Sequence, residues 1–390
     1  MTARYGLSLY PGLDNSEEEN RALLQEAHAL GYGRIFTSLQ IPEADRDVLR
    51  RQAVTLFQLA RDLGFEIMAD VSPATASLFQ WPDLTPARIT DLGITTVRFD
   101  YGIDTATMAA FSRVCRIQCN ASTLREEDLQ ALERAGCDLT RVEGLHNFYP
   151  HRYTGLSLDY VRQQNHLLHR YGAHAGMFLA GRHGRRSPLK EGLPTVEAWR
   201  DREPADVAEA AWQAGCDFLL LSESRPSREE MERLAAKKRV LVPKEAVRET
   251  DTVTPASEPL VFHVKPWPDP GSSAATDQPV RLLGRLLDRP LSNRPDPAEA
   301  CIRVAEGRNL FHGAVLPPCN IAAGNPQDIL PVGTVLVDNS RYGRYAGETQ
   351  ILLQPRPAES RSTPVGCVAA ADLGKLAAVG PGTSFRLVRV

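Results

Sequence analysis

The chain has 390 residues, a length that suits two domains of ordinary size. Its 43% hydrophobic and 24% charged residues are typical of a globular protein with a sizeable core. The formal net charge of −3 argues against binding to nucleic acid or to an anionic membrane, because both favour a basic surface. The first residues, MTARYGLSLYPG, lack the pattern of a signal peptide, and no apolar run approaches the roughly 18 residues that span a bilayer. We therefore expect a cytoplasmic protein without membrane or nucleic-acid partners.

The cysteines are odd in number and scattered, which fits reduced thiols. They stand at positions 115, 119, 137, 216, 301, 319 and 367. Cys115 and Cys119 are the only close pair, and no second pair follows at zinc spacing, so we predict that they pack in a core. His146 and His151 are also spaced wrongly for one helical face. We expect neither a metal nor a cofactor.

Eight short apolar runs, most of them followed by a polar turn and an amphipathic stretch, repeat over the first 240 residues. GLSLYPG (6–12) precedes a predicted helix that ends at Gly31, with Asn15 as its predicted N-cap. RIFTSLQI (34–41) precedes a predicted helix over 46–63. The remaining predicted strands cover 65–72, 95–102, 116–122, 174–181 and 217–224, and one more lies within 139–149. Helices are predicted over 125–136, 158–172 and 228–238.

This alternation predicts an α/β fold, a (β/α)8 TIM barrel over residues 1–245. The strands are mostly apolar on both faces, as expected for parallel strands covered by helices. A doubly wound open sheet is the alternative. It is disfavoured because no GxGxxG follows the first strand and no GxxxxGK[ST] occurs in the chain.

The alternating pattern of apolar runs and amphipathic stretches ends near residue 245. A polar, proline-containing stretch predicts a linker over 246–258. Short strand-like runs follow at 260–266, 331–339, 348–357 and 384–390, with one candidate helix over 280–287. Residues 259–390 therefore predict a small β-rich barrel domain.

Polar residues at the ends of the predicted barrel strands are the candidate functional residues, because barrel enzymes place their chemistry at the carboxyl ends of the strands. The carboxylates, amides and aromatic rings found there suit a carbohydrate site. Glycoside cleavage needs a protonated acid and either a second carboxylate or an acetamido group. The candidate carboxylates are Asp70, Asp100, Glu143, Glu191, Glu197 and Glu223. The alternative role for each of them is an ion pair that holds a loop, for example with Arg98 or Arg200.

A basic loop follows the seventh predicted strand and contains Arg182, Arg185, Arg186 and Lys190. Guanidinium groups suit the oxygens of phosphate and carboxylate. A solvated loop is the usual interpretation of such a charge run, and the position after a barrel strand places an anion site on an equal footing with it.

Five segments of the chain resemble the bacterial 6-phospho-N-acetylmuramidase family. They are RIFTSLQIPE (34–43), VRFDYG (97–102), HNFYPHRYTGLS (146–157), EGLPTVEAWR (191–200) and VLVDNSRYGRYAGETQI (335–351). They occur in the family's order and run nearly from end to end. The resemblance implies a TIM-barrel glycoside hydrolase with a C-terminal cyclophilin-like β domain.

The resemblance also implies an activity, the release of N-acetylmuramic acid 6-phosphate from β-1,4-linked N-acetylglucosamine during peptidoglycan recycling. The partner would be a phosphorylated amino-sugar disaccharide, and a homodimer is left open. Strand-end position and motif membership make Asp100 and Glu191 the predicted catalytic residues. The predicted substrate-binding residues are Asp70, Arg98, His146, Asn147, Tyr149, Arg182, Arg185, Glu197 and Glu223. Two alternatives remain open, another barrel enzyme such as an isomerase or lyase of a phosphorylated sugar, and a non-catalytic sugar-phosphate-binding protein.

Overall fold

The computed structural model describes residues 5–99, 103–237, 259–267, 277–316 and 329–390. The chain forms two compact units, which are considered separately below. The first comprises Met1–Arg152 and Leu156–Arg248, and the second comprises Tyr153–Gly155 and Glu249–Val390.

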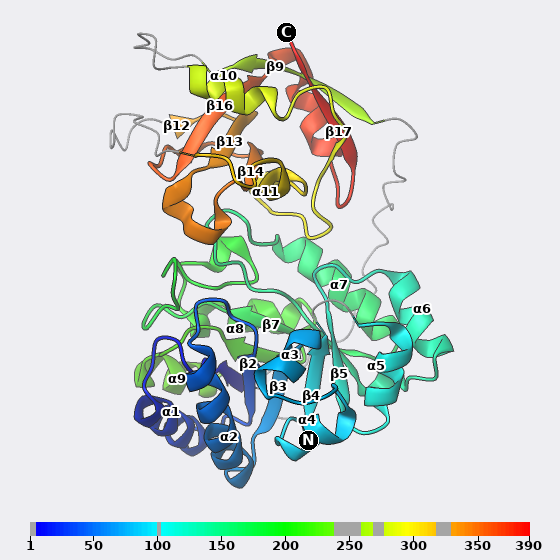
Figure 1. Ribbon diagram of the computed structural model, residues 1–390, viewed down its shortest axis with the longest axis vertical. Coiled ribbons are helices and arrows are strands. Elements are labelled where there is room, and N and C mark those ends of the chain that lie inside the picture. Colours follow the sequence, from blue (N-terminus) through cyan, green and yellow to red (C-terminus); the bar gives the residue numbers. More distant parts are fainter. Residues whose placement is uncertain (1–4, 100–102, 238–258, 268–276, 317–328) are drawn as a thin grey trace. The chain divides into compact units, whose positions relative to one another are not determined.

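The first unit contains a closed barrel of eight parallel strands (Figure 1). The strands are β1 (Tyr5–Ser8), β2 (Arg34–Ser38), β3 (Glu66–Val71), β4 (Thr96–Phe99), β5 (Arg116–Asn120), β6 (Val142–Leu145), β7 (His174–Leu179) and β8 (Phe218–Leu221). Because β1 pairs in parallel with both β2 and β8, the sheet has no free edge. The predicted TIM barrel is confirmed, and the open doubly wound sheet is excluded.

Helices follow most of the strands and begin at recognisable caps. They are α1 (Glu17–Ala29), α2 (Arg46–Asp62), α3 (Pro73–Leu78), α4 (Pro86–Asp91), α5 (Thr105–Ser112), α6 (Glu126–Arg134), α7 (Leu158–Arg170), α8 (Pro204–Gln213) and α9 (Arg228–Ala235), with 3-10 turns η1 (Leu139–Arg141) and η2 (Glu197–Trp199). The predicted N-cap of α1 was wrong by one residue. Ser16 is the cap, and its side chain accepts a hydrogen bond from the backbone N–H of Glu19. Asn15 instead donates to the carbonyl of Ser224, at 2.7 Å.

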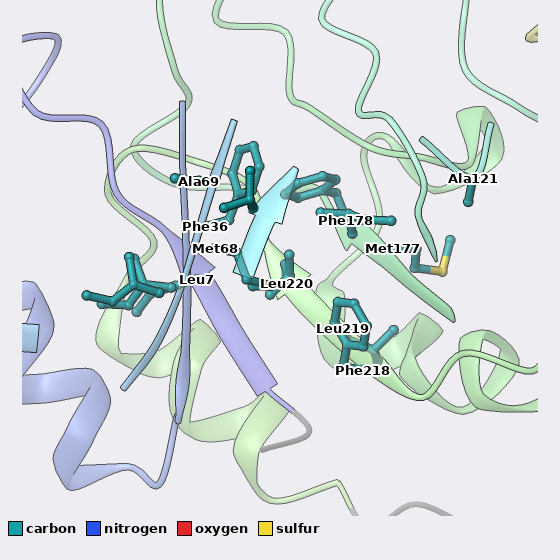
Figure 2. Close-up of a cluster of buried hydrophobic side chains, with 14 of the residues drawn as sticks. Leu7, Phe36, Met68, Ala69, Ala121, Met177, Phe178, Phe218, Leu219 and Leu220 are labelled. Atoms are coloured by element: carbon teal, nitrogen blue, oxygen red, sulfur yellow. The ribbon is translucent and has the colours of Figure 1, made fainter. Parts of the chain in front are cut away.

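Large apolar side chains fill the barrel interior. Phe36 of β2 and Phe178 of β7 meet edge to face with their ring centroids 4.9 Å apart, and Figure 2 shows them side by side. Gly176 of β7 lies against Phe218 of β8, and a Cβ atom there would come within 2.2 Å of the Phe218 ring. Only glycine therefore fits at position 176 without displacing an interior ring.

Glu143 does not lie at the carboxyl end of its strand, so its prediction as a rim carboxylate was wrong. Strand β6 begins at Val142, which places Glu143 near the amino ends of the barrel strands. There its carboxylate accepts hydrogen bonds from Arg34, at 2.6 and 3.2 Å, and from Gln118, at 3.0 Å. Arg34 and Glu143 are both almost fully buried, so this pair is part of the barrel core.

The second unit is built on a seven-stranded sheet in the order β10-β17-β9-β16-β13-β14-β11. Its strands are β9 (Leu260–Pro266), β10 (Leu291–Ser292), β11 (Cys301–Val304), β13 (Thr334–Asp338), β14 (Thr349–Leu352), β16 (Ser362–Val368) and β17 (Ser384–Arg389), and β12 (Ile329–Leu330) pairs separately with β15 (Arg356–Pro357). A bridge between Asn293 and Val304 links the two edges, so the sheet is nearly closed. This confirms the predicted β-rich barrel.

In the part of the second unit that the structure describes, two short helices and two 3-10 segments accompany the sheet. They are α10 (Asp277–Gly284), α11 (Gly307–Leu310), η3 (Ser340–Tyr345) and η4 (Ala370–Ala378). The apolar core of this unit includes Phe262 and Phe385, whose rings meet edge to face at 5.9 Å. Within the described ranges, none of the helices has the length and apolar character needed to cross a membrane. Cys115 and Cys119 are buried free thiols, as predicted.

Candidate active site

Three predicted site residues meet at the carboxyl ends of the barrel strands. Asp70 near the end of β3 forms an ion pair with Arg98 of β4, at 2.7 Å between Oδ1 and Nη1. The other terminal nitrogen of Arg98 donates to the side-chain oxygen of Asn147, which follows β6. Asp70 and Arg98 are buried, and Asn147 is half-buried. The arrangement joins three strands and presents a carboxylate, a guanidinium and an amide at the barrel mouth.

The loops after β6 and β7 are tied together by Arg200. Its guanidinium donates to the carbonyls of Tyr149, Gly192 and His151, at 2.9–3.0 Å. It also binds both carboxylate oxygens of Glu197, at 2.6 and 2.7 Å. Glu197 thus has the alternative role foreseen for the rim carboxylates, an ion pair that holds a loop.

Main-chain hydrogen bonds continue this connection. The N–H of Tyr149 donates to the carbonyl of Pro194 at 2.9 Å, and the N–H of Leu156 donates to the carbonyl of Thr195 at 2.9 Å. The hydroxyl of Thr195 donates to the carbonyl of Asn147, at 2.9 Å. The segments 146–157 and 191–200 therefore form one hydrogen-bonded body beside the Asp70–Arg98 pair.

His146 lies on the helix side of the barrel wall, where it is 0% exposed. The side-chain amide of Asn165 donates to the carbonyl of Ala214, so its oxygen faces His146 and accepts from Nε2–H, at 2.9 Å. Burial lowers the pKa of His146 to about 4. The imidazole is therefore neutral, and it anchors the start of the 146–157 segment.

Two arginines of the basic loop are neutralised within the protein. Arg185 donates to Asp201 at 2.9 Å and to the carbonyl of Arg200 at 3.0 Å. Arg182 donates to the carbonyl of Asp201 at 3.0 Å and lies 3.8 Å from Glu203. Burial alone would raise the pKa of Asp201, but hydrogen bonds from Arg152 and Arg185 outweigh it and lower that pKa to about 2.

Arg186 is the exception in this loop. It is only 4% exposed, and its guanidinium carbon lies 4.9 Å from the centroids of both the Tyr10 ring and the Phe148 ring. Its Nε is buried without a hydrogen-bond partner, and no carboxylate of the described residues pairs with its guanidinium. A buried cation with aromatic rings as its neighbours is costly unless an anion completes its surroundings. Arg186 is thus a buried cation with no ion pair to any carboxylate of the described residues.

Glu223 fixes the position of Arg186. It follows β8, is 0% exposed, and accepts backbone hydrogen bonds from Arg186 at 3.0 Å and Leu193 at 2.8 Å. Burial raises the pKa of its carboxyl, although these N–H groups favour the charged form. Glu223 therefore closes the 186–193 loop, and its buried carboxylate has no surface for a ligand.

Of the two predicted catalytic residues, only Glu191 lies within the described part of the chain. Glu191 is half-buried in the same loop, where its carboxylate accepts from the backbone N–H of Arg152 at 3.3 Å. Asp100 lies outside the described residues. No group of three or more His, Cys, Asp or Glu among the described residues is arranged to hold a metal ion.

Sequence reasoning included Arg186 in the basic loop but did not separate it from its neighbours. Tyr10, in the first predicted strand GLSLYPG (6–12), was given no role. Tyr10 donates its hydroxyl to the carbonyl of Ser222 at 2.9 Å, and burial raises the pKa of its hydroxyl to about 12. Its ring is therefore a fixed, uncharged wall beside Arg186.

The mouth of this TIM barrel combines buried carboxylates, an amide and a buried arginine, and it is the face at which TIM-barrel enzymes bind their substrates. Comparison with known families makes this specific. Residues 5–236 match the N-terminal model of 6-phospho-N-acetylmuramidase, and residues 281–388 match its C-terminal model. The chain belongs to the 6-phospho-N-acetylmuramidase family. It is therefore a glycosidase.

Solved structures of similar proteins share the whole architecture. One is an uncharacterized B. cereus protein, with 24% identity, a TM-score of 0.53 and full coverage of both chains at 100%. Another is a conserved protein from Enterococcus faecalis with an unknown function, with 26% identity and a TM-score of 0.53, over 99% of this chain and 96% of that one. The search of curated proteins gave no match.

Proposed function

We propose that the barrel hydrolyses the β-1,4 bond between N-acetylmuramic acid 6-phosphate and N-acetylglucosamine, in the recycling of peptidoglycan. The observation that carries this proposal is Arg186, a buried guanidinium that has no carboxylate partner among the described residues. The substrate offers two anionic groups, the 6-phosphate and the lactyl carboxylate. Either has oxygens that a guanidinium binds in a bidentate manner.

Arg186 replaces Arg182 and Arg185 in our assignment of the anion-binding group. Those two arginines are engaged by Asp201 and by backbone carbonyls, so they shape the loop. Arg186 projects from the same loop toward Tyr10 and Phe148. These rings exclude water on two sides of the guanidinium, which strengthens its attraction for an anion.

We assign the proton transfer to Asp100 and Glu191. Asp100 follows β4 directly, in the position where barrel enzymes place catalytic groups. One of the two would protonate the leaving glycosidic oxygen, and the other would act at the anomeric centre, where water supplies the hydroxyl group of the released N-acetylmuramic acid 6-phosphate. Asp70, Arg98 and Asn147 are proposed to bind sugar hydroxyls from the adjoining strand ends.

Four predicted substrate-binding residues are proposed to act indirectly instead. His146, Tyr149, Glu197 and Glu223 make their described contacts within the protein and hold the two loops. Their role is to keep the mouth of the barrel preorganised, which lowers the cost of ordering it around a substrate.

The wider setting follows from the substrate. A disaccharide phosphorylated at entry is found in the cytoplasm, so we place the enzyme there. We propose residues 1–245 as the catalytic domain, 246–258 as a linker and 259–390 as the second domain. No cofactor, nucleic acid or membrane is needed for this chemistry, and a homodimer is compatible with it.

Substrate discrimination tests the proposal. The purified chain is incubated with the 6-phosphorylated disaccharide and, in parallel, with the unphosphorylated disaccharide, and free N-acetylglucosamine is measured. Release from the phosphorylated substrate alone is expected. Equal turnover of both would remove phosphate recognition from the proposal, and no release from either would contradict the reaction.

A further inference from the structure

The second unit contains a basic cavity that the proposed reaction does not use. Its volume is about 580 Å³, and three arginines and a histidine line it, namely Arg294, Arg308, Arg344 and His312. No aspartate or glutamate stands among the described residues that line it. A concentration of four basic side chains is unexpected in a chain whose formal net charge is −3. The cavity therefore has a strong local bias toward anions.

Two of these arginines are held in fixed positions. The Nε of Arg294 pairs with Asp296 at 2.9 Å, and Asp296 is itself almost completely buried. The guanidinium of Arg344 stacks on the Tyr345 ring, 5.0 Å from its centroid, and donates to the hydroxyl of Tyr345 at 2.8 Å. Anchored guanidinium groups lose little freedom when a ligand binds, so their donors are preorganised.

The neighbouring carboxylates are bound by Arg294 and Arg303. Asp296 is shared between Arg294 and Arg303, which lies 3.5 Å from it, and Glu348 is bound by Arg303 at 2.6 Å. Arg308, in the short helix α11, has no ion-pair partner within the described part of the chain. A phosphate dianion in the cavity would give Arg308 the charged partner that it lacks among these residues.

The cavity wall also has an apolar part. Phe311 and Leu316 line it and are buried, and Ala305, Ala314 and Ala346 extend the surface. The volume lies within the range of about 300–1,000 Å³ that is usual for sites of small organic ligands. Such a wall can pack against a sugar ring or another organic group that carries the anion, whereas a bare ion would make no use of it.

We propose that this cavity binds a small phosphate monoester, with Arg294, Arg308 and Arg344 around the phosphate and Phe311 beside the attached ring. All of its described lining residues belong to the second unit. Arg186 is not among them. The chain would carry two sites for phosphorylated ligands, the barrel site for the substrate and the second-unit cavity for a further phosphate ester.

Calorimetric titration of the full-length protein tests the proposal. The probe is glucose 6-phosphate, with glucose as its uncharged match, and the protein carries Arg186→Met to silence the barrel site. We expect one binding event for the phosphate ester and none for glucose. Arg308→Glu should weaken it at least tenfold and Arg308→Lys less, whereas Arg289→Glu, an exposed arginine outside the cavity, should change it less than twofold.

Two results would overturn the proposal. One is an affinity that is the same in Arg308→Glu and in the Arg289→Glu control. The other is the absence of any binding of glucose 6-phosphate to the Arg186→Met protein. Crystals soaked in tungstate, a phosphate analogue with a strong anomalous signal, then locate the site. A peak among Arg294, Arg308 and Arg344 is expected, and peaks confined to other positions would contradict the assignment.

Discussion

Replacing Arg186 by methionine separates its charge from its packing. Methionine keeps an unbranched apolar stem between the rings of Tyr10 and Phe148, and it lacks the guanidinium. Removing a buried cation that has no ion pair among the described residues should not destabilise the free enzyme, because burying that charge is itself costly. The melting temperature of Arg186→Met should therefore equal or exceed that of the wild type.

The loss should appear in substrate recognition. Removing one partner of a buried, hydrogen-bonded charge pair costs about 2–5 kcal/mol in binding. Because about 1.4 kcal/mol corresponds to a factor of ten, kcat/KM for the phosphorylated disaccharide should fall by about 30-fold to about 4,000-fold. The matched control is Arg202→Met, an exposed arginine shortly after the same loop, which should lower kcat/KM less than twofold.

Two fragments of the substrate identify the anion that Arg186 binds. N-acetylglucosamine 6-phosphate carries the phosphate without the lactyl group, and N-acetylmuramic acid carries the lactyl carboxylate without the phosphate. Their inhibition constants are measured for wild type and Arg186→Met, and only the fragment with the recognised group should lose affinity. Unchanged kcat/KM in Arg186→Met, or equal small losses for both fragments, would refute the reasoning from the unpaired guanidinium.

Three further substitutions test the catalytic and supporting residues. Asp100→Asn should lower kcat at least about 100-fold without a change in melting temperature, whereas Asp104→Asn, at the exposed cap of α5, should leave kcat unchanged; a fully active Asp100→Asn enzyme would remove Asp100 from the mechanism. Glu223→Gln should lower the free energy of unfolding by about 1–3 kcal/mol, because the new amide N–H would face a backbone N–H. The exposed control Glu229→Gln should leave it unchanged. Urea unfolding of both variants measures this difference, and equal stabilities would contradict the role of Glu223. The pKa of His146 falls from 6.5 to about 4 on folding, so between these pH values the unfolded chain binds a proton that the folded chain does not. The free energy of unfolding should therefore drop by up to about 3 kcal/mol as the pH falls from 6.5 to 4. His146→Gln should flatten this part of the pH–stability curve, and an identical slope in the variant would show that other groups cause it.

The barrel was predictable because its strands are continuous apolar runs separated by polar turns. For the nearly closed sheet of the second unit, the same kind of pattern predicted only some of the strands. Strand β16 was missed, although it lies between β9 and β13, because its sequence STPVGCV contains a proline and a glycine. The register of β13 and β16 shifts between Val335 and Leu336, and Leu336 pairs with Pro364. An irregular register accommodates a residue that has no N–H to donate.

The candidate site was predictable by position and less so by role. Strand ends correctly brought Asp70, Arg98 and Asn147 together, because parallel strands of a barrel end at one face. The choice among Arg182, Arg185 and Arg186 depended on Asp201 and Glu203, which lie about twenty residues later in the chain and take up the first two arginines. Glu143 was misplaced because the run 139–149 did not fix where the strand begins; the 3-10 turn η1 takes up its first residues, so Glu143 is the second residue of β6.

The pairing of β1 with β8 has a consequence for synthesis on the ribosome. Asn15 and Ser224 are separated by 209 positions, and their hydrogen bond belongs to the seam where the first and last strands meet. Strand β1 must therefore wait, with one edge unpaired, until β8 has left the exit tunnel. Such sequence-distant pairing slows folding and exposes a strand edge to other nascent chains. Translation speed upstream of residue 224 should thus influence the yield of folded enzyme, independently of its final stability.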